Sequence, residues 1–381
     1  MSRRRSVGIR FLQIGLVVAS GVVLMDMVRR ADLRRAGRLV LEVGPWALLL
    51  LVPGLLSILL QAIGWRPVLD FLGRRVHIVR LAAIRLAAEA VLMSVPAGAV
   101  ASDYVALSLL QRRADVPIPE GLAAIAARRV LVVLTNALYV ALALALGYSH
   151  LGRASVGLGG ASWPWLAWLM VAAALVLLGS ASVMTLAVFS GNVAARLRRL
   201  LSRIPLGSAR AWLLERAGRF DEIDRQFGRL ASMPRSSLVG STVVFSAVWV
   251  IEAVETLIAL RLVGAPIGFT EALAIEVLVS LLRSIAFVLP SGIGVQDAGY
   301  IALLAAFGIP DAATTGVAFL IIKRARELFW IAIGYGVLAL LAGTLRGAVP
   351  PTHDHPATGR GGWPSRSHSG AKSTEHRPSG R

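Results

Sequence analysis

The chain has 381 residues, of which 56% are hydrophobic and 16% are charged, and its formal net charge is +19. This excess of apolar residues excludes an ordinary soluble domain and predicts a protein that crosses a membrane several times. The absence of cysteine excludes disulfides, thiol nucleophiles and cysteine metal sites, and the positive charge indicates cytoplasmic loops near anionic lipid headgroups rather than a nucleic-acid partner.

Six apolar stretches are long enough to cross a bilayer, because about 20 helical residues span its ~30 Å core. They are residues 7–28, 39–62, 122–147, 163–190, 236–263 and 312–345. The first stretch follows a basic N terminus and mimics a signal peptide. We expect it to be a retained helix, because no small-residue cleavage site precedes Asp26.

Two other apolar regions, residues 81–110 and 268–308, are each interrupted by proline and glycine. The helix-breaking residues are Pro96 and Gly98 in the first region, and Pro290, Gly292 and Gly294 in the second. The leg that follows Gly98 would reach only ~20 Å as a helix, which is too short to cross comfortably. We therefore predict that these regions form two re-entrant hairpins or pairs of short helices.

The two broken regions resemble each other and predict an internal duplication. A shift of 194 residues places Pro96 on Pro290, Gly98 on Gly292 and Asp103 on Asp297, and one-residue adjustments place Pro117 on Pro310 and Arg129 on Arg324. Three predicted crossings separate the copies, so the second copy should be inverted. The expected fold is an all-α polytopic membrane protein with an inverted repeat, an arrangement typical of transporters with a site near the midplane.

Basic loops predict the orientation of the chain. The segment 191–235 holds ten arginines and four acidic residues, and the loops at 65–80 and 111–121 are basic as well. The positive-inside rule therefore places both termini and these loops in the cytoplasm. Residues 29–38, with five arginines, would then lie outside and disagree with the rule.

The predicted cytoplasmic loop contains an amphipathic helix over residues 209–231. Its apolar positions are Phe220, Ile223, Phe227 and Leu230, at spacings of three and four residues. We expect this helix to lie on the membrane surface or against the bundle. We divide the chain into a transmembrane part, 1–346, and a basic, disordered cytoplasmic tail, 347–381, because the tail is too rich in proline, glycine and serine to form a core.

Charged residues inside the apolar segments are the candidates for a functional site, since each costs about 2.5–3.5 kcal/mol to insert at mid-membrane. The repeat places Glu89 opposite Arg283, and Lys323 and Glu327 are four residues apart and able to pair. Arg85 and Glu89 are also four residues apart and able to pair, and this pair could have either a functional or a purely structural role. The full set expected around a headgroup-handling cavity is Glu89, Asp103, Arg129, Glu252, Glu255, Glu276, Arg283, Asp297, Lys323, Arg324 and Glu327.

Catalytic motifs are missing from the sequence, which favours a non-enzymatic protein. We find no dinucleotide loop, phosphate-binding GxxxxGK[ST] run, HExxH zinc motif or nucleophile elbow. Only His77 and His150 lie outside the tail. We therefore expect no metal and no cofactor.

The stretch from Trp249 to Trp330, including "GVQDAGY" and "KRARE", resembles the lysylphosphatidylglycerol synthase transmembrane-region family, also called flippase-like membrane proteins. It is most similar to the hopanoid-biosynthesis-associated (HpnL-type) branch, although Asp297 stands where glutamate is usual. The resemblance implies a multi-pass protein of the bacterial inner membrane that translocates lipids. The chain continues for only 35 residues after Arg346, so we expect no aminoacyl-transferase domain.

Three functions remain open from the sequence. The first is a flippase-like transporter of hopanoids or anionic phospholipids, acting alone or as a homo-oligomer. The second is a scaffold that docks hopanoid or envelope-lipid enzymes of the membrane through the 191–235 segment. The third is a membrane-embedded lipid-modifying enzyme in which Glu252, Glu255 and Glu276 serve as acid–base groups.

Overall fold

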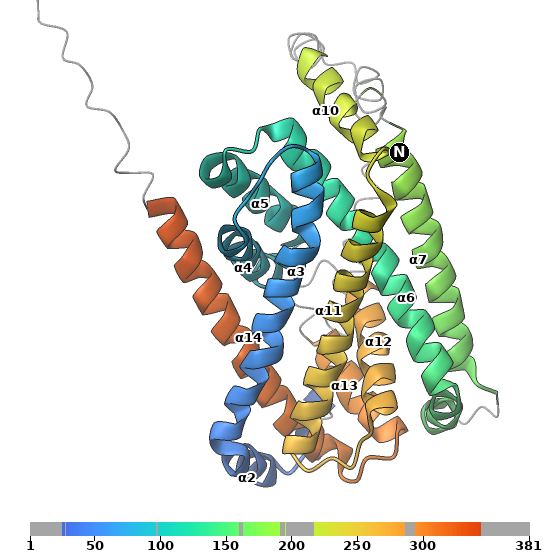
Figure 1. Ribbon diagram of the computed structural model, residues 1–381. Helices are drawn as coiled ribbons and strands as arrows, with labels where there is room; N and C mark the ends of the chain where they lie inside the picture. The colour runs from blue at the N-terminus through green and yellow to red at the C-terminus, as the bar shows by residue number, and fades with distance from the viewer. Residues whose placement is uncertain are drawn as a thin grey trace, which may run out of the picture.

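The computed structural model describes residues 25–26, 28–96, 98–159, 163–190, 195, 217–285 and 294–343. The regular elements in this part of the chain are all helices, arranged as an elongated bundle (Figure 1), so the predicted all-α fold is confirmed. They are α2 (Leu33–Val43), the 3-10 helix η1 (Gly44–Leu50), α3 (Leu51–Phe71), α4 (Ile78–Ser94), α5 (Gly98–Ala114), α6 (Ile118–Gly159), α7 (Trp165–Phe189), α10 (Ala217–Leu230), α11 (Arg235–Leu262), α12 (Phe269–Ile285), α13 (Val295–Ala306) and α14 (Ala312–Gly343).

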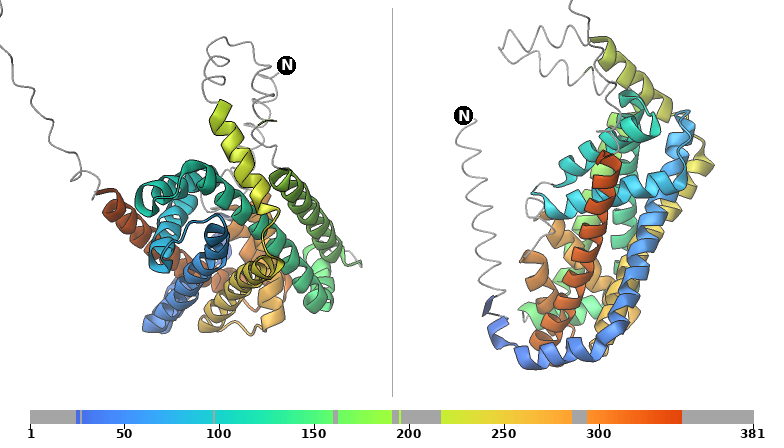
Figure 2. Two further views of the ribbon diagram at one scale, coloured as in Figure 1. Left: turned by 45° about the horizontal axis from the view of Figure 1, so that its top comes forward. Right: turned by 90° about the vertical axis from the view of Figure 1, so that its left-hand side faces the viewer.

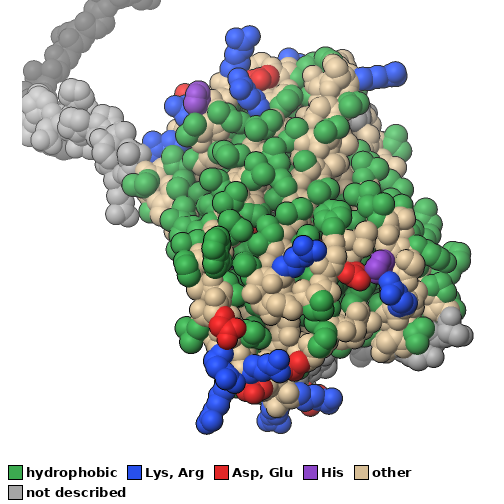
Figure 3. All heavy atoms as spheres, turned by 60° about the horizontal axis from the view of Figure 1, so that its bottom comes forward, with side chains coloured by type: hydrophobic (Ala, Val, Ile, Leu, Met, Phe, Trp, Pro, Cys, Tyr) green, Lys and Arg blue, Asp and Glu red, His purple; other side chains and the backbone are tan. Residues whose placement is uncertain are grey.

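Five helical stretches among the described residues are long and apolar enough to cross a membrane. They are Leu33–Phe71, Ile118–Leu158, Trp165–Val188, Arg235–Leu262 and Ala312–Ala342. Each overlaps one predicted span, and the remaining prediction, residues 7–28, lies almost entirely outside the described residues. Between the charged ends, the flank of the molecule is covered by hydrophobic side chains (Figure 3). The chain is therefore a multi-pass membrane protein.

The predicted span over residues 39–62 has the wrong boundaries. α2 ends at Val43, because Gly44 adopts a φ of +48° and Pro45 follows it in the sequence. The crossing helix α3 starts only at Leu51 and continues to Phe71. α2 instead lies across one end of the bundle (Figures 1 and 2), where the side chain of Arg35 pairs with Asp311 at 3.1 Å.

Both broken regions contain a pair of short helices, α4 with α5 and α12 with α13, and their re-entrance into a membrane stays a prediction. α4 starts at the end of the bundle where α3 stops, and α5 ends where α6 starts. An ion pair between Arg74 and Glu120, at 2.9 Å, joins these two connections. α12 and α13 enter and leave by the opposite end in the same way, so the hairpins occupy opposite halves of Figure 1.

The predicted inverted repeat relates α3–α6 to α11–α14. α3 and α11 run in opposite directions and pack against each other. Equivalent glycines, Gly73 and Gly264, lie in the turns that follow α3 and α11 and have φ values of +83° and +82°. The copies also exchange partners, because α4 packs on α14 and α12 packs on α6. The two hairpins are thus each held by the last long helix of the other copy.

The helix predicted over residues 209–231 is present as α10, Ala217–Leu230. Phe227 and Leu230 are buried where α10 packs against α6 and α7. The side chain of Phe220 and the start of the predicted segment lie outside the described residues. The apolar face of α10 is therefore covered by the bundle at least over its last two turns.

Loops that were predicted to share a side lie at the same end of the bundle. The α3–α4 and α5–α6 connections lie at the end that carries α10, and α2 and the α11–α12 and α13–α14 turns lie at the other end (Figures 1 and 2). The described loops are thus grouped at the two ends as predicted, and residues 29–38 lie at the end opposite α10. Which end faces the cytoplasm stays a prediction.

Candidate functional site: a charged cavity between the hairpins

A partly open cavity with many charged residues in its wall lies between the helices and consists of two adjoining lobes. The larger lobe has a volume of about 350 Å³ and the smaller one about 90 Å³. Both are lined by side chains from the first copy and from the second copy. The residues shared by the two lobes are Gln61, Glu89, Met93, Glu252, Arg283 and Glu327. The cavity therefore lies at the interface between the copies, as the repeat predicts for a transport site.

Most of the charged residues singled out from the sequence line this cavity. Those in the lining are Glu89, Arg129, Glu252, Glu255, Glu276, Arg283, Lys323 and Glu327. Glu89 and Arg283, which the repeat set opposite each other, line both lobes. Asp103, Asp297 and Arg324 lie outside the lining. Asp297 pairs with Arg324, and Asp103 pairs with Arg128 and Arg129. The role of the lining residues in binding stays a prediction.

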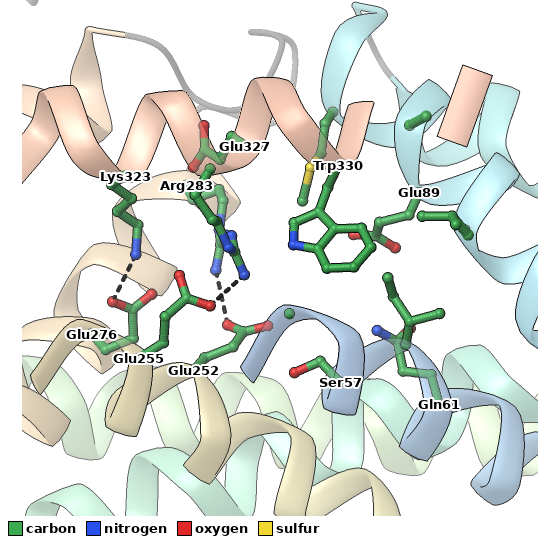
Figure 4. A pocket seen from close by; sticks show the side chains of 16 residues that line it. Ser57, Gln61, Glu89, Glu252, Glu255, Glu276, Arg283, Lys323, Glu327 and Trp330 are labelled. Carbon is green, nitrogen blue, oxygen red and sulfur yellow. Dashed lines mark hydrogen bonds and ion pairs between the residues drawn. The ribbon is translucent and has the colours of Figure 1, made fainter. Parts of the chain in front are cut away.

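Glu276 connects four helices of the second copy at the wall of the smaller lobe. Its side chain is 2% exposed and accepts hydrogen bonds from the hydroxyls of Thr256 and Tyr300, each at 2.6 Å. The Nζ of Lys323 lies 3.5 Å from the same carboxylate (Figure 4). Lys323 and Glu327 thus do not form the pair expected from their spacing, since Glu327 instead contacts Arg324 at 2.5 Å.

Two further acid–arginine pairs cross the second copy. Arg326 donates a short hydrogen bond to Glu255, and Arg283 lies 3.6 Å from Glu252. The side chains of Arg283 and Glu252 keep 38% and 31% exposure although they lie inside the bundle. Among the charged residues of this copy that line the cavity, these two have the most exposed side chains (Figure 4).

The same tether is built twice by the repeat, once in each hairpin. In the first copy, Arg129 donates to Asp103 at 2.8 Å and to the carbonyl of Ala99 at 2.8 Å. In the second copy, Arg324 donates to Asp297 at 3.1 Å through Nε and at 2.5 Å through Nη2. Equivalent residues thus attach the second leg of each hairpin to the long helix that follows. Asp103 and Asp297 therefore tie helices together, a role that their spacing from the prolines does not predict.

The hairpin breaks have local causes that can be named. A Cβ on Gly98 would lie 2.3 Å from the carbonyl oxygen of Leu92, so only glycine allows the two legs to approach this closely. Gly294 adopts a φ of +86° and starts α13, and its N–H donates to the side chain of Asp297 at 3.0 Å. Pro96 lies in the turn between α4 and α5, whereas Pro290 and Gly292 lie outside the described residues.

Three arginines of the first copy line the larger lobe: Arg85, Arg128 and Arg129. Arg85 donates to Gln61 and to Glu89, each at 2.7 Å. Arg128 donates to Asp103 at 3.1 Å and lies over the ring of Trp65 at 5.7 Å. Sequence reasoning missed Arg128, although the shift that pairs Arg129 with Arg324 also pairs Arg128 with Lys323.

This arrangement is suited to holding a polar group inside an apolar protein. Buried ion pairs are costly unless hydrogen bonds satisfy both partners, and most of these charges are satisfied across helix boundaries. Side chains of both signs, open to one cavity, can offer donors and acceptors to a headgroup. The geometry therefore combines a cavity with charged side chains that pair across helices in its wall.

No curated protein shows a significant match to this chain. The family described as "Lysylphosphatidylglycerol synthase TM region" matches residues 12–349, and the resemblance noted in the sequence extends over the helices that build both hairpins and the cavity. Because this match covers most of the chain, the protein belongs to the lysylphosphatidylglycerol synthase transmembrane-region family, a membrane domain associated with lipid-related function.

Proposed function

We propose that the protein moves the polar headgroups of membrane lipids between leaflets, without changing them chemically. The observation that carries this proposal is the charged cavity lined by hairpins that enter from opposite ends of the bundle. A site reached by two inverted, broken segments is the arrangement of alternating-access transporters. The family supports a lipid-related role but does not specify transport.

The charges of the cavity are suited to carrying a headgroup. A polar group that leaves water for hydrocarbon without partners costs several kcal/mol, and an ion costs more. Arg283 and Glu252 keep about a third of their side-chain surface open and are 3.6 Å apart. A headgroup can therefore approach either charge, because both side chains remain partly exposed.

We favour transport over lipid chemistry and over a scaffold role. Glu252, Glu255 and Glu276 each lie beside a cation, so none is positioned as a free acid–base group. The last two turns of α10 pack their apolar residues against the bundle, which leaves less surface for docking an enzyme. The bacterial inner membrane, cytoplasmic termini, homo-oligomers and the hopanoid-associated branch are finer parts of this proposal.

The test is a leaflet-resolved translocation assay on the purified protein in proteoliposomes. Arg283→Gln should slow the exchange of a fluorescent phospholipid at least about tenfold, which corresponds to ~1.4 kcal/mol. Arg66→Gln is the matched control, because the side chain of Arg66 is 51% exposed and lies away from the lining. Equal exchange by wild type, Arg283→Gln and protein-free vesicles would refute the proposal. The same assay with a polar-headed hopanoid tests the finer assignment.

A further inference from the structure

The helix α2 crosses one end of the bundle and leaves one of its sides exposed (Figures 1 and 2). Its inner side is covered, because Ala36 and Val43 are buried in the core. On the outer side, Arg34, Arg38 and Leu41 follow one another at spacings of four and three residues and therefore share one helix face. All three side chains are exposed, so no described residue covers this face.

The outer face of α2 carries cations that have no carboxylate partner. Two of the five arginines in residues 29–38 form ion pairs, but no described residue forms an ion pair with Arg34 or Arg38. The helix itself holds three arginines and one acidic residue, Glu42, which leaves an excess of two positive charges. A surface of anionic groups would complement this face.

Large apolar side chains are exposed beside these arginines. Leu33 and Leu41 of α2 are 57% and 80% exposed, and Trp46 of the following η1 is exposed as well. The exposed apolar surface continues through Leu48 into the crossing helix α3 at Val52. A helix that exposes both leucine and arginine is typical of the interface between headgroups and hydrocarbon, where tryptophan is also enriched. The border of the membrane should therefore pass along α2.

Two contacts fix the orientation of α2 about its own axis. The backbone N–H of Asp32 donates to the hydroxyl of Thr314 at 3.1 Å, and the side chain of Arg35 pairs with Asp311 at 3.1 Å. Thr314 lies in α14, and Asp311 directly precedes that helix. The unpaired arginines are thus held on the outer side by the fold itself, so little conformational freedom is lost when they contact a surface.

We propose that α2 is an interfacial helix that binds the anionic headgroup surface of the leaflet at its end of the bundle, through Arg34 and Arg38. Leu41 and Trp46 then enter the border of the hydrocarbon, while the long apolar stems of the arginines let their guanidinium groups reach phosphate oxygens. This surface lies outside the cavity and concerns lipids that stay in their leaflet. It also provides a partner for arginines that the positive-inside rule does not expect at this end.

The absence of cysteine from the sequence allows this surface to be tested with a single label. The full chain carrying Leu41→Cys is labelled with a bimane fluorophore and reconstituted in phosphatidylcholine vesicles. These contain the same minor fraction of either brominated phosphatidylglycerol or brominated phosphatidylcholine. Both brominated lipids should quench the label, and the phosphatidylglycerol should quench it at least about twofold more strongly. No quenching by either lipid would place this face in water or against another protein, and equal quenching would remove the anionic preference; each result would overturn the proposal.

Substitutions in the labelled chain separate the charge of the arginines from their packing. Arg34→Gln combined with Arg38→Gln should make the two brominated lipids equal quenchers, whereas the same pair changed to lysine keeps the charge and should keep the preference. Glu42→Gln removes a negative charge from α2 and should increase the preference. Arg66→Gln, at an exposed arginine near the other end of α3, should leave it unchanged. A preference that persists in the glutamine pair, or that does not rise in Glu42→Gln, would contradict the assignment.

Discussion

Glu276→Gln is the sharpest test of the charged pairs in the cavity wall, because this carboxylate is almost fully buried and has three partners. The substitution keeps the shape of the side chain but leaves the ammonium of Lys323, a residue that is 8% exposed, without its carboxylate. The amide oxygen of glutamine can still accept a hydrogen bond from Thr256 or Tyr300, so the main loss is the ion pair. Removing one partner of a buried pair costs about 3–5 kcal/mol, and we expect a loss of this size in the free energy of unfolding.

The measurement is the free energy of unfolding in mixed micelles, titrated with SDS and followed by circular dichroism. Glu276→Gln combined with Lys323→Met removes both charges and should recover ~2 kcal/mol relative to Glu276→Gln alone. Glu42→Gln, at an exposed glutamate of α2, is the control and should change stability by less than ~0.5 kcal/mol. A loss below ~1 kcal/mol for Glu276→Gln, or no recovery in the double variant, would refute the buried pair.

Three further predictions, with four substitutions in all, can be tested in the same titration. Asp297→Asn removes the ion pair with Arg324 and weakens the cap of α13, and it should cost about 2–4 kcal/mol; a change below ~0.5 kcal/mol would show that the tether is not structural. Gly98→Ala forces a Cβ to 2.3 Å from a backbone carbonyl and should cost at least ~2 kcal/mol. Gly152→Ala, with no atom within 4 Å of its Cβ, should instead stabilise α6 by about 0.5–1 kcal/mol. A Gly98→Ala variant that is more stable than the Gly152→Ala variant would contradict the close approach of the two helices. Arg35→Ala breaks only the exposed pair with Asp311 and should cost less than ~1 kcal/mol, so a larger loss would mean that α2 is a structural clamp.

The two hairpins could be predicted from the sequence, but the positions of their acidic residues could not. The proline and glycine spacing identified both breaks and related Asp103 to Asp297, and the structure places both acids at equivalent points of equivalent hairpins. Each acid nevertheless pairs with the arginine of the following long helix instead of lining the cavity. A repeat shift shows which residues are equivalent, but it does not show the side of a helix that a neighbouring helix covers.

Within the site, the charged residues were largely foreseen and their partners were not. Rarity alone identifies a charge in an apolar segment, because each is expensive there. Lys323 has Glu327 one turn away, yet it contacts Glu276 on α12, since α12 and α14 present these groups to each other. Arg128 was overlooked because it stands beside Arg129 in the sequence and no local pattern distinguishes them.

The sequence by itself determined the helical, membrane-spanning character, the two breaks and the inversion of the repeat. The physical reason is local: in hydrocarbon every backbone group must be satisfied within its own segment, so apolar length and helix-breaking residues decide the outcome. Only the tertiary structure decided which charges pair and which remain open to the cavity. These depend on α4 packing on α14 and α12 on α6, contacts between segments that are far apart along the chain.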